Sequence, residues 1–325
     1  DLFTNVDVSP INGITSYIMN NGDMLNKGFS ISLNGYPVKT KNFRWYMSTY
    51  YSVNLNKVQT DDARNYNLNY LNGTAVVSGQ PISTFYSYKF LGLNPQNGAP
   101  MFDDWEDRWH LLQGKTLDEV VPMILVNSGT RDPKFSGDLN NTFTYKNWSL
   151  SLNFSYSLGS KVRLFEMYGP IINGISAAAN VREEFLDRWQ VPGDEKYTVY
   201  PLIISPSSPD YEHYRLHYSA PQRAVGPNSG VPAFANNVWQ MYDDSDLRVV
   251  SGNYLKLQSL SFSYRLNDRL LRKTPFTQLS ISFNTHNCFT ISAKELRGQD
   301  PSQAGFADAG LSIRPSYTIG LNVSF

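Results

Sequence analysis

The sequence predicts an all-β fold, a transmembrane antiparallel β-barrel with long extracellular loops and a short loop helix. The clearest segment, Trp148–Leu158 (WSLSLNFSYSL), is apolar at every even position and polar at every odd position, which is the period of a two-faced strand. A tilted strand needs roughly 9–11 residues to cross a bilayer, which matches this segment. Aromatic residues make up 14% of the chain and charged residues only 17%, a balance typical of barrels with aromatic girdles.

The polar face of this segment carries small, uncharged side chains. Ser149, Ser151 and Asn153 alternate with Leu150 and Leu152. Small polar residues suit the crowded, wet interior of a large barrel, and apolar residues suit contact with lipid. We therefore expect the apolar face to point outward at lipid and the polar face inward at a lumen.

The N-terminal half contains fewer regular segments. Gly28–Leu33 alternates, and Trp45–Leu55 continues as a second long strand after a short connection, so the two predict a hairpin. Residues 56–80 are polar and Asn-rich, as expected for a long loop. Ile82–Phe90 predicts another strand, whereas residues 94–133 show no clean alternation.

The middle of the chain combines a second hairpin with a long loop region. Phe135–Tyr145 and Trp148–Leu158 are separated by two residues, which predicts a tight turn between paired strands. Residues 160–249 are rich in proline and are expected to form a long extracellular loop region. Within it, Asn180–Gln190 predicts a short helix, because Asn180 is a suitable N-cap and Glu183 follows three residues later. Leu117–Val121 is compatible with a helical turn or a short strand.

Strand signals return near the C-terminus. In Leu255–Leu266 the apolar residues change from odd to even positions at Gln258-Ser259, which predicts a β-bulge. Leu279–Phe283 predicts a further strand, and Tyr317–Phe325 alternates without a break. About eight or nine strands are expected in all. Because open sheet edges are not tolerated in lipid, these strands must close with one another or with strands from outside the chain.

Composition excludes several classes of protein. The 28 basic and 28 acidic residues cancel (28 − 28 = 0) and form no basic stripe, so nucleic acid is not an expected partner. The single Cys288 cannot form an internal disulfide, and no apolar run reaches the length of a transmembrane helix. The chain opens on Asp1-Leu2-Phe3 without a signal peptide, so we expect a mature fragment that lacks its beginning.

No set of residues predicts catalysis or metal binding. His213 and His217 are four apart but lack the HExxH pattern of zinc proteases. The acidic groups at Asp103–Asp107 and Asp243–Asp246 lack calcium-loop spacing. We therefore expect neither an enzyme nor a cofactor or metal site.

Two sets of aromatic residues are candidates for function. Those in loops could contact a substrate or a lid protein, belong to an interface girdle, or pack loop against loop; they are Trp105, Trp109, Trp239 and Tyr242. Those of the last strand form a pattern that resembles the signal read by the outer-membrane assembly machinery; they are Tyr317, Ile319, Leu321, Val323 and Phe325.

Several segments resemble the SusC/RagA family of TonB-dependent outer-membrane transporters. Asn20–Leu33 (NNGDMLNKGFSISL) is similar to the family's N-x-G-x-x-x-N-K-G-x-E-x-x-L strand entry, with Ser30 where Glu is usual. Gly92–Phe102 resembles the G-L-D-P-x-x-G-x-P connection. Asp132–Tyr145 resembles the P-x-F-x-G-G-x-x-N-x-x-x-Y hairpin, with Asp138 in place of the second Gly.

The resemblance continues to the C-terminus. Asp187–Pro201 (DRWQVPGDEKYTVYP) is similar to the family's R-W-x-x-P-G-D loop, and Ser251–Leu266 is similar to its A-S-F-L-R-L-K-N-I-T-L-G-Y-x-L strand. Gly298–Pro301 (GQDP) resembles the G-x-D-P loop, and Tyr317–Phe325 resembles the last strand. These seven segments occur in the order that the family has them.

The resemblance implies that residues 1–325 are the C-terminal part of a 22-stranded plugged barrel, whose N-terminal plug and TonB box lie outside this chain. It also implies active import of a nutrient, an oligosaccharide or a peptide, across the bacterial outer membrane. The implied partners are a SusD-like surface lipoprotein, the TonB-ExbB-ExbD complex and outer-membrane lipid. A dimer of transporter–lid pairs is an assembly that the resemblance leaves open.

Two other hypotheses remain open at this point. A soluble β-sandwich that binds or cleaves carbohydrate would turn the apolar faces inward against a second sheet. A passive porin or a membrane-anchored adhesin would share the barrel but would not need TonB.

Overall fold

A computed structural model describes residues 3–7, 11, 13, 16–20, 22–60, 65–171, 180–203, 211, 230–232, 234, 237–302 and 314–325. The chain divides into two compact units. The sheet unit comprises Asn26–Asn56, Asp132–Lys161 and Ser251–Phe325, and the loop unit comprises Asp1–Leu25, Lys57–Arg131 and Val162–Val250. Among the described residues, no helix has the length and apolar character required to cross a membrane.

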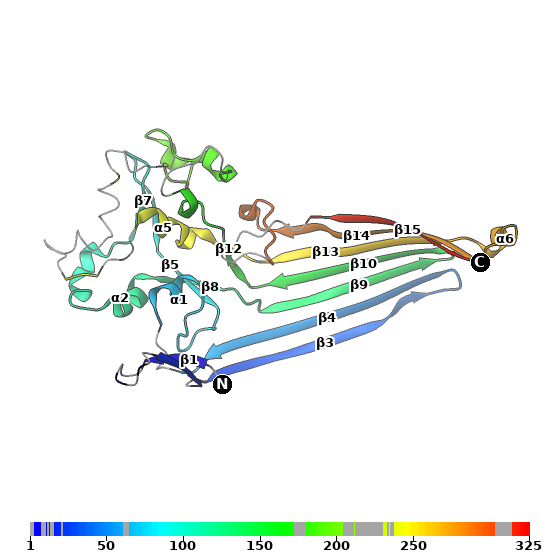
Figure 1. Ribbon diagram of the computed structural model, residues 1–325, viewed down its shortest axis with the longest axis horizontal. Coiled ribbons are helices and arrows are strands. Elements are labelled where there is room, and N and C mark those ends of the chain that lie inside the picture. Colours follow the sequence, from blue (N-terminus) through cyan, green and yellow to red (C-terminus); the bar gives the residue numbers. More distant parts are fainter. Residues whose placement is uncertain are drawn as a thin grey trace. The chain divides into compact units, whose positions relative to one another are not determined.

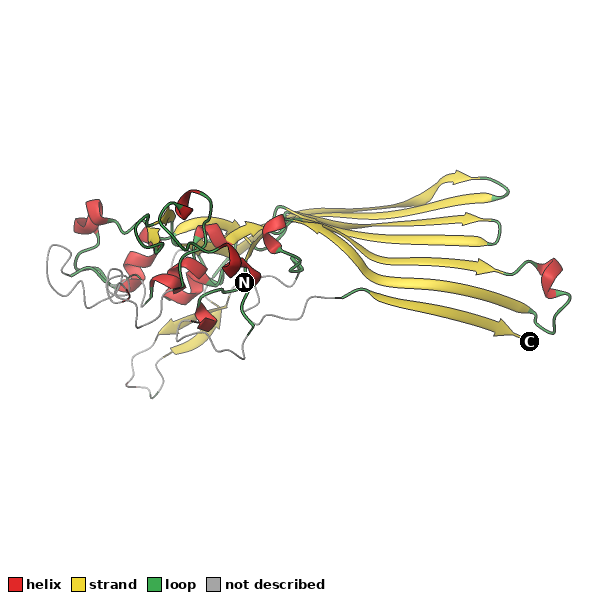
Figure 2. Ribbon diagram, turned by 90° about the horizontal axis from the view of Figure 1, so that it is seen from above, coloured by secondary structure: helices red, strands yellow, loops and turns green. Residues whose placement is uncertain are grey.

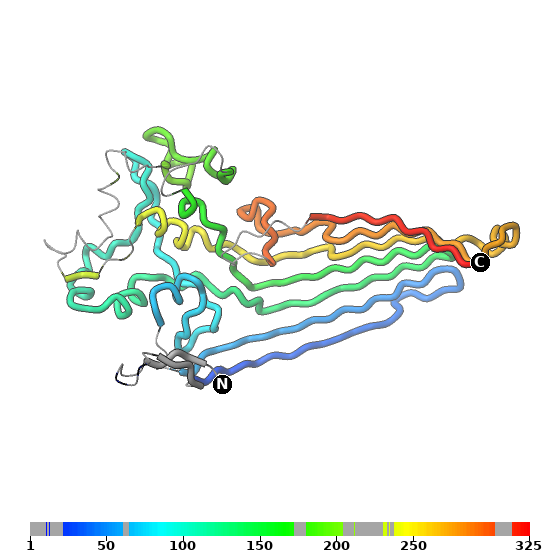
Figure 3. The backbone as a smooth tube through the Cα atoms, viewed as in Figure 1, coloured from blue at the N-terminus to red at the C-terminus, as the bar shows by residue number. Residues whose placement is uncertain are grey.

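Seven long antiparallel strands form the sheet unit (Figure 1). Their spatial order is β15-β14-β13-β10-β9-β4-β3, and Figures 2 and 3 show them running side by side. The strands are β3 (Met24–Lys39), β4 (Phe43–Val58), β9 (Phe135–Tyr145), β10 (Trp148–Leu158), β13 (Tyr254–Arg265), β14 (Gln278–Ser292) and β15 (Ser316–Ser324).

Both hairpins expected from the sequence are confirmed. The second one pairs Trp148 with Tyr145 and continues to Leu158 opposite Phe135, with Lys146 in the left-handed region at φ 51°. The bulge expected at Gln258-Ser259 is also confirmed, because the register against β10 shifts there. β14 is much longer than the expected Leu279–Phe283, since the alternation is interrupted by Asn287 at φ 54° while the pairing continues beyond it.

Short and long connections alternate between the two ends of the sheet. Residues 40–42, 146–147 and 266–277 join strands at one end, the last of these with the small helix α6 (Asp268–Leu271). At the other end, residues 59–134 and 159–253 connect one long strand of the sheet to the next. This asymmetry is the pattern of outer-membrane barrels, which have short periplasmic turns and long extracellular loops.

The apolar face of the sheet is exposed. Phe29 is 56% exposed, Leu33 60% and Ile319 76%. The cluster of buried apolar residues lies entirely in the loop unit, so no second sheet of the described chain covers Leu150, Leu152 or Phe154. A contiguous apolar surface of this kind indicates a membrane or a large interface. A soluble β-sandwich would need a second sheet packed on this face, so the exposed face argues against that hypothesis.

Polar groups on the apolar face are hydrogen-bonded within the chain. The Trp45 indole Nε1 donates to Asn141 Oδ1 at 3.0 Å, and Thr49 Oγ1 donates to the Asp138 carbonyl at 2.9 Å. Thr285 Oγ1 accepts from Cys288 Sγ at 3.4 Å. Hydrocarbon offers no hydrogen bonds, so satisfied polar groups are what a lipid-facing surface requires.

An aromatic cluster marks the turn end of this face. Trp148 lies 4.2 Å from the ring of Tyr264 and 5.2 Å from that of Phe262, measured between ring centroids. Tyr145 lies opposite Trp148 in the register. Such amphipathic rings are enriched at the headgroup level of membranes.

The loop unit consists of short elements. Its helices are α1 (Asn67–Leu71), α2 (Leu117–Ile124) and α5 (Val238–Asp243). Its 3₁₀ turns are η2 (Glu106–Leu111), η3 (Gly169–Ile171), η4 (Glu183–Asp187), η5 (Asp194–Lys196) and η6 (Asp246–Arg248). Its strands pair as β1 (Phe3–Asp7) with β2 (Ser16–Asn20), β5 (Thr84–Ser87) with β8 (Val126–Thr130), and β6 (Phe90–Leu93) with β7 (Pro100–Phe102). β11 (Lys161–Arg163) and β12 (Val249–Ser251) form a pair where the units join in sequence.

Two sequence expectations in this unit are wrong. Ile82–Phe90 is not a barrel strand: it is divided between β5 and β6, and residues 84–87 are buried in the loop unit. Asn180–Gln190 forms only the 3₁₀ turn η4, because Arg182 and Arg188 are extended on either side and no side chain caps it. Leu117–Val121 proves to be helical, within α2, where Glu119 and Thr116 form a capping box.

The described parts of residues 160–249 are also more ordered than their proline content suggests. Together with residues 57–131 they build one hydrophobic core. Met241, Phe234 and Leu112 are among its fully buried members. The core forms through contacts between distant segments, and such contacts leave no periodic signal in the sequence.

The orientation of the sheet predicts an asymmetric response to charge. Leu152→Arg places a cation at the middle of the apolar face and should cost roughly 2–4 kcal/mol of folding free energy in lipid. The neighbouring Asn153→Arg points to the polar face and should cost much less. The measurement is urea titration of the full-length protein refolded in lipid vesicles, followed by heat-modifiable gel migration. A larger cost for Asn153→Arg would contradict the orientation.

Candidate functional site: a polar wall and a folded loop unit

Rows of small polar side chains run across the non-lipid face of the sheet. The register aligns Thr142 of β9, Ser151 of β10 and Ser261 of β13. Thr142 Oγ1 and Ser151 Oγ are 3.1 Å apart, and Ser261 Oγ donates to Asn284 Oδ1 at 2.6 Å. Hydroxyl and amide groups both donate and accept hydrogen bonds, so this face is a wall that can exchange hydrogen bonds with water or a polar solute.

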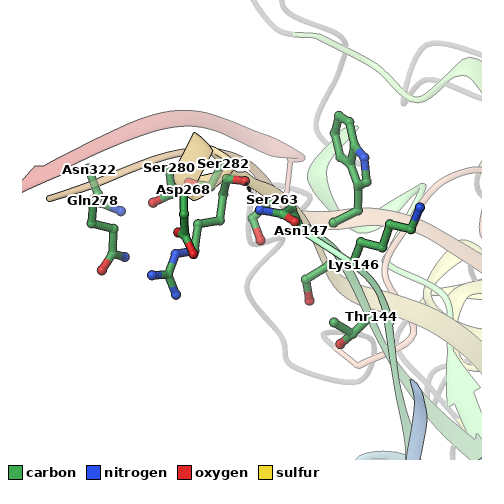
Figure 4. A pocket seen from close by; sticks show the side chains of 12 residues that line it. Thr144, Lys146, Asn147, Ser263, Asp268, Gln278, Ser280, Ser282 and Asn322 are labelled. Atoms are coloured by element: carbon green, nitrogen blue, oxygen red, sulfur yellow. Dashed lines mark hydrogen bonds between the residues drawn. The ribbon is translucent and has the colours of Figure 1, made fainter. Parts of the chain in front are cut away.

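The polar wall has a hollow of about 510 Å³ near the hairpin turns (Figure 4). Its side chains come from five neighbouring strands and their turns. They are Thr144, Lys146, Asn147, Trp148, Ser149, Ser263, Arg265, Asp268, Gln278, Ser280, Ser282 and Asn322. Thr144, Ser149, Ser263 and Ser282 occupy one row of the register, so the hollow is built by strand pairing and not by a loop.

Two of the four candidate loop aromatics are buried. Trp239 is 3% exposed and Tyr242 is fully buried, both in α5. Trp239 Nε1 donates to the Leu202 carbonyl at 3.2 Å, and the Tyr242 ring meets Tyr168 edge to face at 5.4 Å. This arrangement matches loop packing, one of the alternatives left open by the sequence, and their role in substrate contact stays a prediction.

Trp105 and Trp109 are half-buried and lie at one side of this core. Trp105 has φ 61°, the left-handed region, and the Arg108 guanidinium lies 4.1 Å above its ring centroid. Arg108 in turn donates to both carboxylate oxygens of Asp103, at 2.8 and 2.9 Å. A bulky residue in the left-handed region is strained, so local contacts hold this ring in a defined orientation.

The acidic groups singled out by the sequence have structural partners. Asp103 binds Arg108, and Asp246 binds Lys89 Nζ at 2.7 Å. Asp243 accepts three backbone N–H groups, from Met167, Tyr168 and Gly169, at 2.8–2.9 Å. Across the described ranges no group of three potential metal ligands is assembled. His213 and His217 lie outside the described residues.

Sequence analysis missed the half-buried cation Arg163. Its guanidinium donates to the carbonyls of Leu71, Tyr86 and Ser245 and to Ser87 Oγ, at 3.0–3.3 Å. Arg163 thereby ties together segments that are distant in the chain. No periodic pattern marks a charge that becomes buried, so the sequence carried no signal for it.

Burial also shifts acid–base behaviour in this unit. Desolvation raises the pKa of Asp244 to about 6, an effect partly offset by the positive charge of Arg163. Desolvation raises the pKa of Asp243 as well. The positive charge of Arg248 and the three backbone N–H groups that donate to Asp243 partly offset this rise. Buried carboxylates resist ionisation because a low-dielectric environment disfavours the charged form.

The last strand presents its aromatic pattern on an open edge. In β15, Tyr317 is 67% exposed and Leu321 64%, and the ring centroid of the terminal Phe325 lies 5.2 Å from that of Phe276. Ile319 shares this face, and Val323 is half-buried on it. The arrangement leaves the strand free to pair on one side, and its role as an assembly signal stays a prediction.

The raised pKa of Asp244 predicts a pH effect on the loop unit. The pKa of about 6 in the folded state exceeds the ordinary aspartate value of 3.8, so the folded form binds the proton more tightly, and the unit gains stability as the pH falls from about 6 towards 4. Hydrogen exchange of the Tyr88 amide, which donates to the Asp244 carbonyl, should slow by roughly tenfold at pH 5 relative to pH 7.5 after correction for intrinsic rates, about 1.4 kcal/mol.

Asp244→Asn should remove most of this pH dependence and slow exchange at pH 7.5. Glu183→Gln changes an exposed carboxyl of the same unit and should leave the pH dependence of exchange unchanged. An unchanged pH profile in Asp244→Asn would exclude Asp244 as its source.

Comparison with known proteins points to one class. No family model matches the chain. It is 24% identical over 96% of its length to TonB-dependent receptor P3 of Formosa agariphila, and 21% identical over its whole length to TonB-dependent receptor P39 of the same organism. It spans about a third of these relatives, 30% and 33% of their respective lengths.

Solved structures show the same fold. The RagAB peptide transporter superposes with a TM-score of 0.67 at 18% identity, covering 98% of this chain and 31% of that one. The RagAB peptide importer in its open-open state gives 0.66 at 19% identity, covering 100% of this chain and 31% of that one. The chain is thus similar in sequence to TonB-dependent receptors, which are proteins of the bacterial outer membrane, and it shares its fold with about a third of the RagAB transporter.

Proposed function

We propose that the chain forms the C-terminal wall of an active importer that carries a nutrient across the outer membrane. The observation that carries this proposal is the two-faced sheet, whose strands each present apolar side chains to lipid and small polar side chains to the opposite side. The relatives are named TonB-dependent receptors, and the similar structures are a peptide transporter, which supports the same class of activity.

The polar wall suits a hydrated solute. Its rows are mostly Ser, Thr and Asn, which offer donors and acceptors without fixed charge. A sugar hydroxyl or a peptide group can exchange hydrogen bonds along such a surface, and no covalent step is needed. The cargo is therefore an oligosaccharide or a peptide.

In this proposal, partner proteins supply the energy for transport and help to capture the cargo. The TonB-ExbB-ExbD complex drives release of the cargo into the barrel through parts of the full-length protein beyond this chain. A SusD-like surface lipoprotein covers the extracellular mouth. The loop unit supports this division, because it has its own hydrophobic core and can present a defined surface to a lid or a ligand.

Trp105 and Trp109 are the aromatic residues that we assign to this contact. Both are partly exposed at the border of the core, unlike Trp239 and Tyr242. Trp105 is held in a strained backbone conformation with Arg108 stacked on its ring. Strain of this kind concentrates at binding and active sites, and a fixed aromatic ring binds a sugar or a peptide with little loss of side-chain entropy.

Dependence on TonB tests the central proposal. Cells that express the full-length protein should accumulate labelled oligosaccharides or labelled mixed oligopeptides, and uptake should fall to background when the TonB-interacting segment is deleted. The control is binding of the same label to the cell surface, which the deletion should leave intact. Uptake that persists after the deletion would favour a passive porin.

The loop aromatics give a second prediction. Trp105→Ala and Trp109→Ala should each weaken binding of the transported label about tenfold, about 1.4 kcal/mol, since alanine keeps the backbone strain at residue 105 and removes only the ring. Tyr197→Ala is the matched control, an exposed aromatic residue of the same unit. Binding is measured by titration of the purified full-length protein in detergent, and equal losses in all three variants would exclude a specific contact.

A further inference from the structure

A buried ion pair joins β13 to the segment that follows β14. Lys256 Nζ lies 2.8 Å from Asp300 Oδ2, and the two side chains are only 6% and 9% exposed. Asp300 also accepts the backbone N–H and the hydroxyl of Ser302. A buried charge needs a partner and further hydrogen bonds to offset desolvation, and both are present here.

Lys256 faces the polar wall because of the bulge in β13. Leu260 and Phe262 occupy even positions on the apolar face, and Lys256 would follow them there if the strand were regular. The register shift at Gln258 places Leu257 opposite Phe154 and Lys256 opposite Ser155. One extra residue therefore moves a cation from the lipid side to the wall, which is a recurrent use of bulges.

Residues 293–302, which we call the strap, are folded compactly against this part of the sheet unit. They begin with the 3₁₀ turn η7 (Lys294–Leu296), in which Leu296 is 1% exposed. Arg297 and Gly298 then adopt left-handed conformations, at φ 45° and 85°, and reverse the chain. The reversal brings Gln299 and Asp300 back towards β13, where both Gln299 and Pro301 are buried.

The side chain of Gln299 does not help to hold the strap in place. Both polar atoms of its side-chain amide are buried, and neither has a hydrogen-bond partner within the part of the chain that the structure describes. Burying an amide without partners opposes the closed position of the strap. The burial of Leu296 and the Lys256–Asp300 ion pair therefore stabilise the closed position and offset this cost.

The geometry points to Lys256 and Asp300 as positioning residues that lock the strap onto the polar wall of the sheet. In the importer proposed above, such a strap narrows the route of the solute. Only this consequence rests on the proposed function. Loss of either charge leaves the other buried and unpaired, so the strap should lift and expose Gln299.

Thiol labelling of the full-length protein in intact cells tests the lock. The reference carries Cys288→Ser and Gln299→Cys, and a membrane-impermeant maleimide reports exposure of the introduced thiol. Asp300→Asn and Lys256→Met should each raise the labelling rate at least tenfold. Lys294→Met removes an exposed lysine of the same strap and should leave the rate within about twofold.

A charge exchange separates the lock from a general structural effect. Lys256→Asp combined with Asp300→Lys should return labelling to within about threefold of the reference, whereas simple loosening of the barrel would not be reversed. Heat-modifiable migration identifies the folded barrels that are scored. Labelling at the reference rate in folded Asp300→Asn, or equal acceleration by Lys294→Met, would overturn the inference. The measurement needs neither cargo nor TonB, so its failure would leave the proposed import function untouched.

Discussion

The sheet depends on the fact that hydrocarbon offers no hydrogen bonds to a backbone. Each strand must pair with its neighbours, and each must turn apolar side chains outward, which fixes the alternation seen from β3 to β15. The same requirement applies to the outer edges of β3 and β15, which pair with no strand among the described residues. In a membrane these edges need strands from elsewhere in the full-length protein. The chain is thus a segment of a wall.

This constraint explains why the sheet could be predicted from sequence. Alternation with period two is local, so Trp148–Leu158 and its partner Phe135–Tyr145 are recognisable without any knowledge of the fold. Even the bulge was visible, as a change of phase at Gln258. The length of β14 was not, because Asn287 interrupts the alternation while the pairing with β13 continues past it.

The loop unit and the candidate site follow different rules. Its core brings together side chains from α2, α5 and the segment around Met167, which are distant in sequence and share no repeat. A lone aromatic residue in such a segment looks the same whether it ends in the core, as Tyr242 does, or at its border, as Trp109 does. For the same reason neither Arg163 nor the pairing of Lys256 with Asp300 could be predicted, since both depend on contacts across tens of residues.

The two sources of stability have a consequence for function. The sheet is stabilised by strand pairing and by lipid on its apolar face, so it needs no core, whereas the loop unit buries its own. Substitutions on the surface of the loop unit can therefore change what is bound without weakening strand pairing in the barrel. The wall carries few charges, and the one buried on its polar face, Lys256, is met by a partner, Asp300. Substitutions in the loops can thus change which solute is selected, while the mostly uncharged wall accepts many polar solutes.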